Sequence, residues 1–263
     1  MRVPNMLPPF TTTRALIDRL DEWINAFTQW HLPLRREPSP QGGLDWKFSS
    51  ETPEALQLAK AVRAATSIRG AVLLADAGMT TEAGSLLRMT ADFAHEIIAV
   101  AEGLMAGRMT TAQQEFVDQF FAPLASTPEQ LESMGKQYYV SREQLFAAHR
   151  RIAENTTGQV DLLRQTTRFL NYGYDKYVHG GYPTAMELFT GRTNTFLLRG
   201  HESARNRAAT LSAVAAKLVE VLAALAFMAM NRRDQPLYES IRSAMRELEG
   251  SGEGTREYLA TQM

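Results

Sequence analysis

The chain of 263 residues contains no cysteine. This absence excludes disulfides, thiolate zinc sites and cysteine nucleophiles, and it fits the reducing cytoplasm in which we expect the protein to act. Neither charge sign dominates, because the formal net charge is −1, and therefore no overall field attracts nucleic acid or anionic lipid. The hydrophobic fraction of 44% is ordinary for a soluble globular protein.

Long uncharged hydrophobic runs are also lacking. The most apolar stretch, residues 208–230, is interrupted by Lys217 and Glu220, and the uncharged run that follows is too short to cross roughly 30 Å of hydrocarbon. The first residues do not contain the apolar core of a signal peptide. We therefore expect no membrane association and interpret residues 208–230 as the central helix of a hydrophobic core.

No stretch of four to eight residues alternates cleanly between β-forming and polar residues, so the sequence predicts no sheet. Helical spacing is found almost throughout. Threonines 11–13, Thr52, and Thr80 or Thr81 are the expected helix caps, and Gly78 is placed where a glycine commonly follows a helix. The expected helices cover residues 11–31, 52–77, 80–106, 111–122, 127–135, 141–154, 158–179, 184–190, 203–231 and 236–249.

These helices predict an all-α fold, a multi-helix bundle built around a long antiparallel hairpin of residues 52–106. Three regions are expected. Residues 1–51 hold an amphipathic helix and a Pro/Gly-rich linker, residues 52–249 form the main helical bundle, and residues 250–263 form a flexible tail.

Polar residues gather on the second helix of this hairpin. Arg88, Asp92, His95 and Glu96 share a broad helical face that borders the apolar positions. They form either an ion pair with a hydrogen-bonded histidine, or a polar cluster that faces a pocket. The spacing of Asp92 and His95 is also that of metal ligands in helical bundles. Because too few further ligands are evident, we predict neither a metal nor another cofactor.

A second candidate region is "NYGYDKYVHGGYP", residues 171–183. His179 lies where a helix is expected to end, so it either complements the helix dipole or belongs to a site. Residues 142–207 carry ten basic against six acidic residues. The arginines that follow His179 form either a solvated face or a phosphate-binding patch; they are Arg192, Arg199, Arg205 and Arg207.

The segments "AVLLADAGMTTEAGSLLRMTADFAHE" and "YDKYVHGG" resemble those of an uncharacterised bacterial all-helical family. The matching positions are Leu86, Leu87, Arg88 and Asp92, then Tyr174 and His179. The resemblance covers about residues 55–180. More loosely, the chain is similar to HEPN-type helical domains of bacterial toxin–antitoxin and antiphage systems.

Many HEPN-type domains are metal-independent ribonucleases that use an Arg-x(4–6)-His motif at a dimer interface. Arg88 with His95, and Arg142 with His149, have this spacing. The resemblance implies a homodimeric defence or stress protein that cleaves or binds RNA.

In that hypothesis His179 is the general base or acid, Arg88 stabilises the charged phosphorane, and Asp92 orients one of them. Substrate RNA would stack on Tyr174 and Tyr177. Arg192 and Arg199 would contact its phosphates.

Two further hypotheses stay open. The first alternative is a non-catalytic helical module that homodimerises or binds a protein partner. It predicts that the polar groups are paired internally and that apolar side chains are exposed elsewhere. The second alternative is a bundle that binds a small ligand or a metal, which requires His95 to converge with at least two other ligands.

Overall fold

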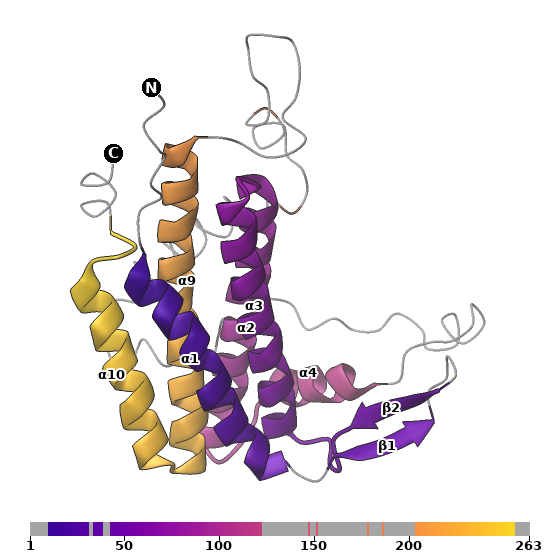
Figure 1. The fold of residues 1–263 in the computed structure, drawn as a ribbon. Helices are drawn as coiled ribbons and strands as arrows, with labels where there is room; N and C mark the ends of the chain where they lie inside the picture. Colours follow the sequence, from indigo (N-terminus) through magenta and orange to yellow (C-terminus); the bar gives the residue numbers. More distant parts are fainter. Residues whose placement is uncertain are drawn as a thin grey trace, which may run out of the picture.

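The computed structural model describes residues 10–31, 34–38, 43–122, 147, 151, 178, 186 and 203–255. Within these residues the chain is a bundle of long helices, so the predicted all-α fold is confirmed (Figure 1). The expected helices within 127–190 lie outside the continuously described segments. The described helices are α1 (Thr11–Thr28), α2 (Pro53–Asp76), α3 (Thr80–Met105), α4 (Thr111–Phe121), α9 (Ala204–Arg232) and α10 (Gln235–Ser251), with a short 3₁₀-helix η1 (Gln29–His31) after α1.

The predicted antiparallel hairpin is formed by α2 and α3. Thr52 caps α2 by accepting a hydrogen bond from the backbone N–H of Ala55 (3.2 Å). At the other end Gly78, with φ of 79°, donates to Ala75, and Met79 donates to Leu74. This pair of hydrogen bonds is a Schellman motif, which satisfies the last carbonyls of a helix.

Met79 also begins α3, because its carbonyl accepts the hydrogen bond from Ala83 (3.0 Å). The prediction that Thr80 or Thr81 caps α3 is therefore wrong. Thr80 is already the first helical residue, and the N-cap position is Met79, without a side-chain cap. One residue serves both helices, and no space remains for a threonine cap between them.

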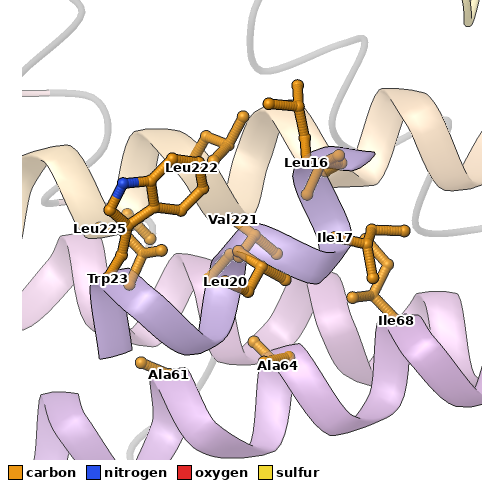
Figure 2. Close-up of a cluster of buried hydrophobic side chains, with 14 of the residues drawn as sticks. Leu16, Ile17, Leu20, Trp23, Ala61, Ala64, Ile68, Val221, Leu222 and Leu225 are labelled. Carbon is orange, nitrogen blue, oxygen red and sulfur yellow. The ribbon is translucent and has the colours of Figure 1, made fainter. Parts of the chain in front are cut away.

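The hydrophobic core lies where α1 crosses α2 and α9. Trp23 is 1% exposed, and its indole N–H donates to the Ser240 hydroxyl of α10 (3.2 Å). Helix α1 thus shares one core with the main bundle, although it was expected in a region separate from that bundle. Figure 2 shows its side chains Leu16, Ile17, Leu20 and Trp23 packed against Ala61, Ala64 and Ile68 of α2 and against Val221, Leu222 and Leu225 of α9.

The N-terminal end of α1 is capped by a side chain that follows α10. Phe10 precedes α1 with left-handed backbone angles (φ 35°) and supplies no side-chain cap. Instead, the carboxylate of Glu253 accepts hydrogen bonds from the backbone N–H of Thr12 (3.1 Å), and from the backbone N–H and hydroxyl of Thr13 (both 2.7 Å). A carboxylate at this position satisfies free N–H groups and interacts favourably with the helix dipole.

Two expectations at the chain ends are thereby corrected. The threonines 11–13 do not precede the helix as caps, since α1 begins at Thr11. The expected tail does not begin at residue 250, because α10 continues to Ser251 and Glu253 is only 8% exposed. The cap by Glu253 could not be inferred from local sequence, because this residue is 240 positions from Thr13.

Helix α9 is the described helix that is long and apolar enough to cross a membrane, with a mean hydropathy of 2.0 in its most apolar window. Of that window, 61% is buried inside the bundle, and a core helix of a soluble protein meets the same criteria. Side chains of α9 such as Leu218 and Leu225 are fully buried in the main core. The expected central position of this helix is confirmed.

The prediction of no sheet is wrong in one place. Strands β1 (Arg35–Pro38) and β2 (Leu44–Lys47) form an antiparallel hairpin in which Arg36 is opposite Trp46 and Pro38 is opposite Leu44. This hairpin extends away from the helices (Figure 1). Each strand has four residues, which is too few for an alternating pattern to stand out in a segment rich in proline and glycine.

Candidate functional site

Arg88 and Asp92 are positioned by α3, one helical turn apart. The guanidinium of Arg88 donates a short hydrogen bond to the carboxylate of Asp92. Arg88 is 1% exposed, among the largest fully buried side chains of the described bundle, whereas the Asp92 side chain is 21% exposed. The pair therefore matches the ion-pair interpretation of these residues.

Helix α9 adds a second ion pair, which reaches α3 at His95, three residues after Asp92. The ammonium of Lys217, 3% exposed, donates to the carboxylate of Glu220 (2.5 Å). The other oxygen of Glu220 lies 3.6 Å from Nε2 of His95 on α3. We call the five residues Arg88, Asp92, His95, Lys217 and Glu220 the α3–α9 ionic cluster.

A third ion pair joins α2 to α3 nearby. Nζ of Lys60 lies 2.8 Å from the carboxylate of Glu96. The same ammonium lies 5.2–5.6 Å from the ring centroids of three phenylalanines, which surround it with the negative faces of their rings. These rings are those of Phe93, Phe116 and Phe120. The ammonium of Lys60 therefore contacts one carboxylate and three aromatic rings.

Helix α4 is held to α3 by a network around Glu102. The amide of Gln113 donates to Glu102 (2.8 Å) and to the backbone carbonyl of Ala99 (2.6 Å). The guanidinium of Arg151 donates to both carboxylate oxygens of Glu102 (2.6 and 2.7 Å). These bonds, with that from Arg151 the strongest cause, hold the pKa of Glu102 below its ordinary value.

The charges in the ionic cluster balance one another, which is what burial requires. A buried charge without a partner destabilises a protein by several kcal/mol, roughly 3–5 when one member of a pair is removed.

No group of three or more His, Asp or Glu side chains among the described residues is placed to hold a metal ion. The convergence around His95 that the metal hypothesis requires is therefore not found in this part of the chain.

The structure brings together Arg88 and Asp92, but the remaining predicted site residues cannot be placed against them. His179, Tyr174, Tyr177, Arg192 and Arg199 lie outside the described residues. A guanidinium that is 1% exposed does not reach a phosphate on the surface without an opening of the bundle. In the structure Arg88 is thus a buried residue of the bundle that pairs with Asp92, and its pairing with His179 stays a prediction.

The two-stranded hairpin is a second candidate region, which the sequence pattern did not predict. In its pleat, Arg36, Pro38, Leu44 and Trp46 share one side, because partners in register and alternate residues along a strand face the same way. We call these four residues the hairpin face. Trp46 is 64% exposed and Leu44 is 52% exposed. Large apolar side chains exposed side by side are typical of interaction sites.

Trp30, 52% exposed, lies at the base of the hairpin in η1. The guanidinium of Arg232, from the end of α9, lies 5.5 Å from the Trp30 ring centroid and 3.0 Å from Nε2 of His31. The ring centroids of His31 and Phe48 lie 5.8 Å apart in an edge-to-face arrangement, and Phe48 directly follows β2 and packs on the main core. His31 therefore connects the hairpin to the helices.

Burial lowers the pKa of His31 below its ordinary value, and the neighbouring guanidinium of Arg232 lowers it further. The neutral imidazole is thus the favoured form in the folded chain. The sequence signals that could have indicated this region are the tryptophans at 30 and 46 and the alternation of Leu44, Trp46 and Phe48.

Comparisons with known proteins add no family to this picture. No protein-family model, no curated protein and no solved structure matches the chain. The resemblance to HEPN-type domains accordingly stays a prediction, and the functional argument depends on the geometry of the two regions described above.

Proposed function

We propose that this protein is a non-catalytic helical interaction module that binds a protein partner through its hairpin face. The observation that carries this proposal is the exposure of Trp46 (64%) and Leu44 (52%) on one side of the hairpin. In contrast, the cation required by the catalytic hypothesis, Arg88, is buried and paired with Asp92. This combination is the one that the interaction hypothesis predicts.

The hairpin has physical reasons to bind another molecule. A two-stranded sheet is marginally stable alone in water and gains stability from a further strand or from packing on its apolar side. Within the described part of the chain no third strand pairs with β1 or β2. Tryptophan is among the residues that contribute most at protein interfaces. Trp46 is 64% exposed, so covering it would remove up to about 160 Å² from water and contribute about 4 kcal/mol at about 25 cal/mol per Å², before the cost of association.

Site-specific photocrosslinking tests this proposal. Trp46 is replaced by benzoylphenylalanine in the full chain, which is irradiated in the cells that naturally produce the protein. The matched control carries the same residue in place of Leu73, which is 70% exposed on α2. We expect a discrete adduct from position 46 that the control does not give and that Leu44→Ser abolishes.

Two results of this experiment change the interpretation. Adducts of equal amount from positions 46 and 73 would refute the proposal, because the hairpin face would then be no different from other exposed surface. An adduct to a second copy of the chain would identify the expected homodimer, which is the other form that the interaction module can take.

A metal-independent activity on RNA is a second candidate, in keeping with the HEPN-type resemblance. It is favoured by one observation, the 3.6 Å approach of a Glu220 carboxylate oxygen to Nε2 of His95, on the same helix as Arg88. A carboxylate beside a histidine can orient the ring for proton transfer. As a cytoplasmic defence or stress protein, the chain would then act on cellular or phage RNA.

The test is cleavage of labelled structured and unstructured RNA in EDTA by the wild type, His95→Ala and His179→Ala. Cleavage that persists in the chelator and disappears in one histidine variant would support this candidate and identify its base. If none of the three folded proteins cleaves RNA, the candidate is discarded and the interaction module remains.

A further inference from the structure

The two sides of the β-hairpin differ in how their charges are neutralised. On the side opposite to the hairpin face, the carboxylate of Glu37 lies 3.1 Å from the ammonium of Lys47 and 3.8 Å from the guanidinium of Arg35. On the hairpin face, the guanidinium of Arg36 lies 5.3 Å from the Trp46 ring centroid. Among the described residues no carboxylate forms an ion pair with Arg36.

The same combination recurs at the base of the hairpin. Arg232 lies over the exposed ring of Trp30, and its hydrogen bond runs to the imidazole of His31 rather than to an acid. Phe48 contacts His31 and directly follows strand β2, which carries Trp46. Two tryptophans therefore each have an arginine over the ring, one on the hairpin face and one at the base of the hairpin.

From this arrangement we infer the chemistry of the partner, an inference that depends on the proposed interaction function. The hairpin face binds an extended acidic segment of another protein, whose carboxylates are held by Arg36 and whose apolar side chains cover Trp46 and Leu44. A guanidinium binds a carboxylate through two parallel hydrogen bonds. A two-stranded sheet also presents backbone N–H and C=O groups along its edges, which an extended segment can pair.

Neither RNA nor a second copy of the chain fits the hairpin face as well. Nucleic-acid sites are broad basic patches, whereas this face has one arginine beside the aliphatic side chains of Pro38 and Leu44, and the chain has a net charge of −1. Two copies that met face to face would bring one Arg36 against another, with no carboxylate on either face.

Selection from a library tests the inference. The full chain is immobilised and random 12-residue peptides displayed on phage are selected on it, in parallel with Trp46→Ala, Arg36→Glu and Arg242→Glu. Arg242 is exposed on α10, so its variant matches the charge change of Arg36→Glu at a different surface. Circular dichroism confirms that each variant is folded.

The expected result is that the wild type and Arg242→Glu enrich peptides that combine Asp or Glu with apolar residues. Trp46→Ala should lose these peptides, and Arg36→Glu should bind synthetic versions at least tenfold more weakly and select basic peptides instead. Enrichment that depends on Trp46 but shows no preference for acids would overturn the inference and leave the interaction function intact.

Two further outcomes would refute the proposed function or assign the hairpin face to a different partner. If the peptides selected on the wild type and on Trp46→Ala are the same, the hairpin face is not a binding surface, and both the inference and the proposed function fail. A labelled 20-nucleotide single-stranded RNA and analytical ultracentrifugation complete the test. Binding of that RNA, or self-association, that is lost in Arg36→Glu would assign the face to RNA or to a second copy, against the acidic segment.

Discussion

The cap that Glu253 provides for α1 leads to the sharpest prediction of stability. We expect Glu253→Ala to destabilise the fold strongly, although Glu253 lies outside every long helix. The carboxylate is 8% exposed and accepts three hydrogen bonds, two of them from backbone N–H groups of the first turn of α1. Phe10 offers no side-chain cap in its place.

The magnitude follows from the groups that lose their acceptor. Loss of an N-terminal cap costs about 1 kcal/mol, and a buried donor left without a partner costs about 1–3 kcal/mol. The N–H of Thr13 is buried, whereas the bond to Thr12 is only partly buried, so water can replace the latter in part. We therefore expect Glu253→Ala to lower the free energy of unfolding by about 2–4 kcal/mol. Glu253→Gln keeps the shape and one acceptor oxygen, and we expect about half of that loss.

Urea unfolding followed by circular dichroism measures these free energies, and a melting curve gives a second estimate. For a chain of this size about 1 kcal/mol corresponds to about 2–4 °C, so the alanine variant should melt roughly 4–16 °C lower. Glu249→Ala is the control, because Glu249 is exposed on α10 and its loss should change the unfolding free energy by less than about 0.5 kcal/mol. If Glu253→Ala also stays within that limit, the capping argument is wrong.

Three further predictions concern ionisable side chains described above. Asp92→Ala should lower the unfolding free energy by about 3 kcal/mol or more in urea, because it removes a carboxylate that pairs with the buried guanidinium of Arg88. The double variant Arg88→Met, Asp92→Leu should recover most of this loss, and equal instability of both variants would contradict this reasoning. Because the pKa of Glu102 is lowered in the folded chain, its stabilisation is present above about pH 4.5 and lost as the pH falls through the folded pKa. Wild type should thus lose more stability than Glu102→Gln between about pH 5 and 3 in pH-dependent urea titrations, and parallel curves would refute this. The pKa of His31 is also lowered in the folded chain, so stability again decreases as the pH falls. The stabilisation is present above about pH 6.5 and is lost as the pH falls through the folded pKa, because a protonated ring would face Arg232. His31→Gln should flatten the unfolding free energy between about pH 6.5 and 5, and an unchanged slope would exclude a contribution from this ring.

The helical hairpin could be predicted because its signals are local. Thr52 followed by Pro53 begins a helix, and Gly78 ends it, through contacts that span no more than five residues. The periodicity of the apolar residues likewise located α9 and α10 to within two residues at each end. The cap of α3 was nevertheless assigned to a threonine, because Met79 has no side-chain signature for its double role.

Contacts between distant segments explain the remaining differences. The ion pair of Arg88 and Asp92 was one of two interpretations that helical spacing allowed. The position of Glu220 beside His95 depends on how α9 packs on α3, which spacing within one helix does not contain. The hairpin face was overlooked because strands of four residues show too little alternation.

The bond between Thr13 and Glu253 has a consequence for the order in which the protein assembles. Because 240 residues separate these partners, α1 is synthesised and left without its cap until nearly all of the described chain has emerged from the ribosome. Closing so long a loop adds a conformational entropy cost that only the packed bundle can offset. Capping of α1 is therefore a late event, and a nascent chain that stops before Glu253 leaves the N–H groups of Thr12 and Thr13 without this acceptor, even where α1 already packs on α2 and α9.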